Sequence, residues 1–191
     1  MGEKAATIFK FEELSECANE KAREWWREHE ADDFGSDPDH LEPADTAARL
    51  LGIELDTRTV RLHGGDTRTE PVIFWSGFST PGSGASFHGD WKFSRDAVKA
   101  IREEFPKDET LHDLADRLMA FESAQRLASR PTGYAHICQG GNEVHEYSMS
   151  ADVYDSEDNE LGPEDEAQFL EIMRDFARWI YKGLEAEYNY R

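Results

Sequence analysis

The hydrophobic pattern of this chain changes period along its length, and this change limits the folds that it can adopt. Apolar residues recur at helical spacing over residues 16–30 and 43–52, and again after residue 94. Between these stretches, residues 59–93 read as short strands separated by turns that contain glycine and proline. Meandering strands with helices before, between and after them predict an α+β fold with a mainly antiparallel sheet. We expect residues 1–191 to form a single domain.

Five segments are expected to form the strands of this sheet. A Gly140-Gly141-Asn142 turn is expected to join the last two segments as a hairpin. Residues 79–84, with the sequence STPGSG, lie between two aromatic segments and are not followed by a helix start. They predict a hairpin loop rather than a phosphate-binding loop. The expected strands are residues 59–63, 71–78, 85–93, 134–139 and 143–154.

Helices are expected near the N-terminus, in the middle of the chain and, as one long helix, at the C-terminus. Thr110 with Asp113 resembles a capping box for a helix in the middle group. The last helix is expected to begin at Pro163, where the following acidic residues suit a helix N-terminus. The apolar stripes predict that Trp25, Phe87, Trp91, Phe176 and Ile180 are buried.

The balance of charge limits the possible partners. The chain contains 41 Asp and Glu residues against 21 Lys and Arg residues, which gives a formal net charge of −20. Such an excess disfavours direct binding to nucleic acid and to anionic membranes, and it predicts a partner with a basic surface. Residues 12–46 hold thirteen acidic and three basic residues, and residues 151–166 hold eight acidic and no basic residues. This concentration fits either a solvated acidic face or a surface that imitates the phosphates of a nucleic acid.

Other features of the sequence favour a cytoplasmic protein. Cys17 and Cys138 are too few and too far apart in sequence to indicate a disulfide framework. No apolar run approaches the roughly 18 residues that a membrane-spanning helix needs. The N-terminus also lacks the apolar stretch of a secretion signal. We therefore expect a cytoplasmic protein that does not associate with membranes.

None of the common hydrolase, zinc-protease or kinase motifs is present, so we expect neither enzymatic activity nor a cofactor. A two-residue turn between the last two strands would place His136 opposite His145, and a turn shifted by one residue would place Cys138 there. His88 could then complete a metal site, and the protein would be a small metal-dependent enzyme. No compact ligand spacing supports this alternative. We therefore expect half-exposed strand histidines and no bound metal.

Three stretches carry a resemblance to known proteins. They are FEELSECANEKAREWW (11–26), FWSGFSTPGSGASFHGDW (74–91) and IYKGLEAEYNY (180–190). In these stretches the chain resembles a broad group of uncharacterised phage, prophage and plasmid proteins that share an SGF segment, a Gly-containing turn and a GASF strand. Some members are labelled as antitoxins of toxin–antitoxin stability systems. Where their turn reads Gln-Gly-Asp-Gly, this chain has PGSG (81–84), which removes an acid and an amide and weakens any catalytic role for the turn.

The resemblance implies a protein that is carried by a mobile element and, by association, an inhibitor of host defence such as an anti-CRISPR or anti-restriction protein. Our leading hypothesis is a non-enzymatic nucleic-acid mimic that blocks the basic surface of a nucleic-acid-handling host complex. The alternative is an antitoxin or regulatory binder that masks a basic toxin. Acids four residues apart on the first expected helix form one row with a spacing of about 6 Å. The predicted partner-binding residues are Glu20, Glu24, Glu28, Asp32, Asp33, Asp155, Glu157, Asp158 and Glu160.

Overall fold

The computed structural model describes residues 15–21, 23, 38–61, 65–78, 82–141 and 144–190. The chain divides into two compact units, Met1–Asp37 and Pro38–Arg191. The expectation that residues 1–191 form a single domain stays a prediction.

In the first unit, residues 16–21 and 23 are helical. Ser15 lies at the start of this helix, where its Oγ accepts the N–H of Ala18 at 3.4 Å. The helix therefore begins where the sequence predicts it. The remainder of the predicted helix lies outside the described residues, and so does Trp25.

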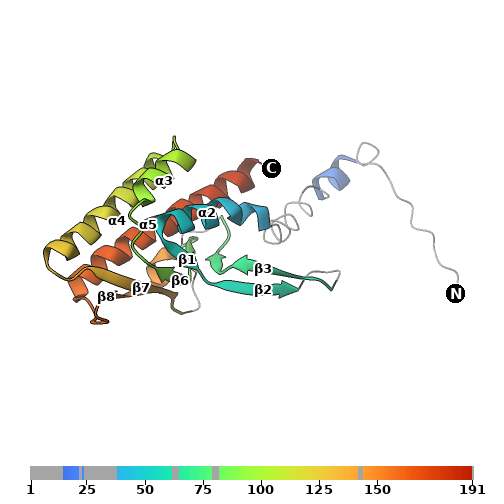
Figure 1. The fold of residues 1–191 in the computed structure, drawn as a ribbon. Coiled ribbons are helices and arrows are strands. Elements are labelled where there is room, and N and C mark those ends of the chain that lie inside the picture. Colours follow the sequence, from blue (N-terminus) through green and yellow to red (C-terminus); the bar gives the residue numbers. More distant parts are fainter. Residues whose placement is uncertain are drawn as a thin grey trace. The chain divides into compact units, whose positions relative to one another are not determined.

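The second unit combines helices with antiparallel strands, so the predicted α+β class is confirmed (Figure 1). Four strands form the main sheet in the order β1-β6-β7-β8, and each neighbouring pair is antiparallel. None of the helices that the structure describes is long and apolar enough to cross a membrane. The elements in chain order are η2 (Pro38–Leu41), α2 (Glu42–Leu51), β1 (Ile53–Leu55), β2 (Thr57–Arg61), β3 (Thr67–Pro71), β4 (Ile73–Trp75), β5 (Ala85–Phe87), β6 (Gly89–Trp91), α3 (Ala97–Glu104), α4 (Glu109–Leu127), β7 (Thr132–Gln139), η3 (Glu146–Ser148), β8 (Met149–Asp155) and α5 (Pro163–Tyr190).

Two further ribbons, β2–β3 and β4–β5, join the main sheet at one point. There, Asp56 donates its N–H to the His88 carbonyl at 2.9 Å, Val72 donates to the Asp56 carbonyl at 2.6 Å, and His88 donates to the Val72 carbonyl at 3.1 Å. The three hydrogen bonds form a closed triangle, in which each residue donates to one of the others and accepts from the third. The triangle connects the chain segments at the points where β1, β3 and β5 end. The sequence pattern does not predict β3, because its residues TRTEP show no alternation of apolar and polar side chains.

The loop between β4 and β5 confirms the prediction of a hairpin. Trp75 pairs with Ala85, so residues 76–84 connect two neighbouring antiparallel strands. Ser76 closes the loop, since its Oγ accepts the N–H of Gly84 at 3.0 Å.

The core lies between the main sheet and helices α2, α4 and α5, which cover one of its faces (Figure 1). Trp91 is fully buried in this layer. Its ring centroid lies 5.0 Å from that of Phe169 and 6.5 Å from that of Phe121, and its Nε1 donates to the Leu51 carbonyl at 3.0 Å. That hydrogen bond satisfies the polar atom which tryptophan carries into the core.

The predicted burial is confirmed for the core residues that the structure describes. Phe87, Trp91 and Phe176 are 0% exposed, and Ile180 is 2% exposed. The rings of Phe87 and Phe176 meet edge to face with centroids 5.6 Å apart, which joins β5 to α5.

The start of α4 differs from the prediction. Its N-cap is Asp108, whose Oδ1 accepts the N–H of Leu111 at 3.0 Å. Trp179 Nε1 donates to the other carboxylate oxygen of Asp108 at 2.7 Å. The predicted capping box of Thr110 and Asp113 is wrong, because an acid two residues before Thr110 already fills the cap.

Candidate functional site: an acidic face of the sheet

The connection between β7 and β8 sets which side chains meet on the sheet, and it departs from the prediction. On β8, Asp152 lies opposite His136 and Ser150 lies opposite Cys138. His145 instead belongs to the connection, residues 140–148, where its side chain caps η3. Both predicted pairings of His145 are therefore wrong. The register of a hairpin depends on the length of its loop, and here the loop holds a helical turn.

The face of the main sheet opposite the helices carries polar side chains. Burial alternates strictly along β8, with buried residues at every second position. The antiparallel register places Glu54, Asp90, His136 and Asp152 side by side across all four strands. Neighbouring strands lie about 4.8 Å apart, so these side chains form a continuous row on one face. The row contains three carboxylates and one imidazole, and His136 Nδ1 hydrogen-bonds to Asp90 Oδ1.

A second group of carboxylates adjoins the end of this row. Glu160 forms a bridge with Tyr154, which brings it beside β8. Carboxylate oxygens of Asp152, Glu160 and Glu166 all lie within 4.8 Å of one another. These residues come from a strand, a loop and the first turn of α5, so only the folded chain brings them together.

Aromatic rings lie beside the carboxylates. Tyr134 and Tyr154 are stacked across β7 and β8, with centroids 4.9 Å apart and an interplanar angle of 23°. His136 meets the Tyr134 ring edge to face at 5.2 Å. We use the name acidic sheet face for this surface, which consists of Glu54, Asp90, Tyr134, His136, Asp152, Tyr154, Glu160 and Glu166.

The pKa values of two neutral groups report a negative potential here. Burial raises the pKa of the Cys138 thiol, and the carboxylates of Asp152, Asp56 and Asp90 raise it further. Burial also raises the pKa of the Tyr154 phenol, with additional contributions led by Asp152 and Glu160. In both cases nearby negative charge disfavours the formation of another anion.

The acids of this face lack cationic partners among the described residues. Asp90 bonds His136, but no lysine or arginine in the described ranges forms an ion pair with Glu54, Asp152 or Glu166. A surface of this kind is free to bind a cationic partner.

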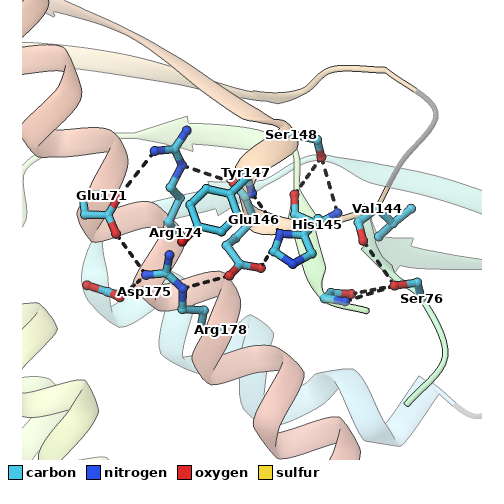
Figure 2. Close-up of polar contacts among 11 residues, drawn as sticks. Ser76, Val144, His145, Glu146, Tyr147, Ser148, Glu171, Arg174, Asp175 and Arg178 are labelled. Carbon is cyan, nitrogen blue, oxygen red and sulfur yellow. Dashed lines mark hydrogen bonds and ion pairs between the residues drawn. The ribbon is translucent and has the colours of Figure 1, made fainter. Parts of the chain in front are cut away.

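In contrast, the acids around the start of β8 are paired with arginines (Figure 2). Arg178 Nε donates to Glu146 at 2.9 Å, and its Nη1 donates to Glu171 at 3.0 Å. Arg117 donates to Asp175 at 2.6 Å. These contacts fasten η3 and α4 to α5, and their charges compensate one another. We assign this network a structural role.

The histidines of the metal hypothesis occupy three separate environments. His88 meets Phe74 edge to face at 5.3 Å, His136 lies in the acidic row, and His145 caps η3. Among the described residues, none of the three belongs to a group with the spacing of metal ligands. The carboxylates of Asp152 and its two acidic neighbours have that spacing, and oxygen ligands of this type suit Mg²⁺ or Ca²⁺.

The predicted partner-binding residues of the first helix can be placed only in part. Glu20 is exposed and forms an ion pair with Arg23 at 3.3 Å. The other members of that predicted row lie outside the described residues. They are Glu24, Glu28, Asp32 and Asp33.

The second predicted group, near residue 155, is partly exposed. Asp155 is buried, and its carboxylate accepts the N–H groups of Glu157 at 2.8 Å and Asn159 at 3.0 Å. The hydrogen bonds from Asn159 and Glu157 lower the pKa of Asp155 despite the opposing effect of burial. Asp155 therefore holds the turn, whereas Glu157, Asp158 and Glu160 are exposed.

Sequence reasoning missed the acids at positions 54, 90, 152 and 166. The signal for the three acids on strands is the alternation of polar and apolar residues, which shows that Asp90 and Asp152 point outward. Glu166 lies on α5 and has no such signal. The alternation does not show which outward residues are neighbours, because that depends on strand order and register.

Residues 39–191 match the model of a family described as a domain of unknown function, DUF8835. The chain belongs to this family, and the matched range contains the whole acidic sheet face. No curated protein and no solved structure matches the chain. The resemblance to phage and plasmid proteins stays a prediction.

Proposed function

We propose that this protein is a non-enzymatic acidic inhibitor that binds the basic, nucleic-acid-binding surface of a host defence complex. The observation that carries the proposal is the acidic sheet face, where carboxylates stand in register without lysine or arginine partners among the described residues. The net charge of −20 acts in the same direction, because it steers the protein toward basic surfaces.

The geometry of the face suits a surface that normally holds nucleic acid. Strand separation spaces the four side chains of the row at steps of about 4.8 Å, and three of the four are carboxylates. DNA presents one phosphate per 3.4 Å of axis along each strand. A groove lined by lysine and arginine would therefore meet a line of carboxylates in place of a line of phosphates. The proposal places the protein in the cytoplasm of the host cell.

The binding we propose is electrostatic, so it should weaken as salt is added. An antitoxin that masks a basic toxin would use the same face and the same physics. The two functions differ in the identity of the partner. The experiment below reports that identity directly.

The test is capture of partners from a lysate of the natural host on three immobilised proteins. They are the wild type, the face variant Asp152→Lys/Glu160→Lys, and the control Glu103→Lys/Glu104→Lys on the exposed end of α3. Both variants change the net charge equally. We expect the wild type and the control to retain one nucleic-acid-handling protein that moderate salt releases, and the face variant to lose it. Equal retention by all three proteins would contradict the proposal, and capture of a toxin would favour the antitoxin.

A further inference from the structure

The acidic sheet face combines carboxylates with a stacked tyrosine pair, and this combination selects among cations. We infer that the partner contacts this face through arginine side chains rather than lysine side chains. The inference rests on the proposed function and specifies the chemistry of its partner. Charge alone would attract either residue, so the aromatic pair is the feature that discriminates.

The guanidinium of arginine fits both parts of the surface. It is planar and presents several N–H donors, so it can bond two carboxylate oxygens at once. The carboxylates of Asp152, Glu160 and Glu166 offer such oxygens within 4.8 Å of one another. The guanidinium also stacks on aromatic rings, and Tyr154 lies among these acids. The lysine ammonium is a compact, strongly hydrated charge that gains less from either contact.

Another part of this protein combines a tyrosine ring with carboxylates, and there two arginines contact both. Arg174 and Arg178 each lie with the guanidinium carbon 5.4 Å from the centre of the Tyr147 ring. The same two arginines bond the carboxylate of Glu171, at 3.4 and 3.0 Å, and Arg178 also bonds Glu146 (Figure 2). Within this chain, arginine therefore occupies the site that a tyrosine ring and clustered carboxylates form together.

The same pairing occurs at the end of α4. Arg126 forms an ion pair with the buried carboxylate of Glu122, with Nε 2.6 Å from Oε1, and places its guanidinium 5.5 Å from the centre of the Phe93 ring. The acidic sheet face has the carboxylates and the tyrosines of these arrangements, and no arginine of the described chain occupies it. A partner's arginine would complete it.

The experiment compares octa-arginine with octa-lysine, each acetylated and amidated, by isothermal titration into the full-length protein at low salt. We expect octa-arginine to bind about fivefold more tightly, since stacking and bidentate bonds act together. Tyr154→Val should reduce this preference to about twofold or less, and Tyr154→Phe, which keeps the ring, should retain it. Tyr154→Val replaces an aromatic residue by a β-branched one, and both types suit strands. The melting temperature of each variant shows whether it is folded.

Each outcome bears on one of the two claims. Equal affinity for both peptides, or an unchanged preference in Tyr154→Val, would overturn the arginine inference and leave the proposed function standing. Binding of either peptide to Asp152→Lys/Glu160→Lys as tightly as to the wild type would overturn the proposed function. Titration with CaCl₂ alone completes the test: tight, stoichiometric uptake that is lost in Asp152→Asn would assign the carboxylates to a metal ion and overturn the inference.

Discussion

Neutralising one acid of the sheet face should make the protein more stable. Asp152 has carboxylate oxygens of Glu160 and Glu166 within 4.8 Å and has no arginine or lysine partner among the described residues. Two charges at that distance repel by about 0.9 kcal/mol in water, and screening at physiological ionic strength roughly halves this value. Asp152→Asn removes two such repulsions, so the free energy of unfolding should rise by about 1 kcal/mol. The melting temperature should rise by about 2–4 °C.

Urea unfolding of Asp152→Asn and wild type at pH 8, in 20 mM and 1 M NaCl, measures this effect. The gain in stability should be present at low salt and almost absent at high salt. Glu104→Gln, which removes an exposed charge from α3, is the control and should change stability by less than about 0.5 kcal/mol. A loss of stability in Asp152→Asn would refute the reasoning, because it would show that the carboxylate makes a favourable structural contact.

Three further predictions concern the scaffold that positions this face. Phe176→Ala should lower the free energy of unfolding by about 3–5 kcal/mol, measured by urea denaturation, because its ring is fully buried. Gly89→Ala should lower the melting temperature, since a Cβ atom there would lie 2.5 Å from the backbone carbonyl oxygen of Glu54, whereas Gly77→Ala meets nothing within 4 Å and should be neutral. Burial raises the pKa of Asp175, but hydrogen bonds from two arginines outweigh it and hold the pKa below its ordinary value. Asp175 therefore contributes stability above about pH 4, and the deficit of Asp175→Asn should be full at pH 6 and disappear as the pH falls through the lowered pKa.

The periodicity of the sequence predicts the core well, and the reason is physical. Phe87 and Trp91 alternate with polar residues on strands, and Phe176 and Ile180 lie one helical turn apart on α5. Phe176 and Ile180 therefore share one buried face of α5, and Phe87 on β5 and Trp91 on β6 are buried as well. Such patterns depend only on local geometry, so the sequence reveals them without knowledge of the tertiary fold.

The register between β7 and β8 could not be predicted from the periodicity of the sequence. Two glycines in the connection predict a tight turn, but the chain continues through η3 before β8 begins. His145 lies at the start of η3, where its side chain accepts the N–H of Tyr147 and its Nδ1 lies 2.9 Å from Glu146 Oε2. No local pattern encodes that longer connection. The neighbours of His136 were consequently mispredicted.

The acidic sheet face contains one acid that the sequence predicts as a binding residue and others that it does not. Glu160 was predicted as a partner-binding residue from the run of acids in its segment, and it lies in the acidic sheet face. Glu54 and Asp90 are isolated acids in the sequence, so only the strand order β1-β6-β7-β8 brings them into a row with Asp152. Charge density along a chain is visible in the sequence, whereas charge density across a sheet requires the topology.

The most direct test of the proposed function is competition for the captured host partner. The partner is bound to a labelled nucleic acid, the wild type or a variant is added, and the fraction of nucleic acid that remains bound is measured by gel mobility shift. We predict that the wild type and Glu103→Lys/Glu104→Lys displace the nucleic acid, and that Asp152→Lys/Glu160→Lys does not. A ternary complex that retains the nucleic acid, or equal displacement by all three proteins, would contradict the role of the acidic sheet face.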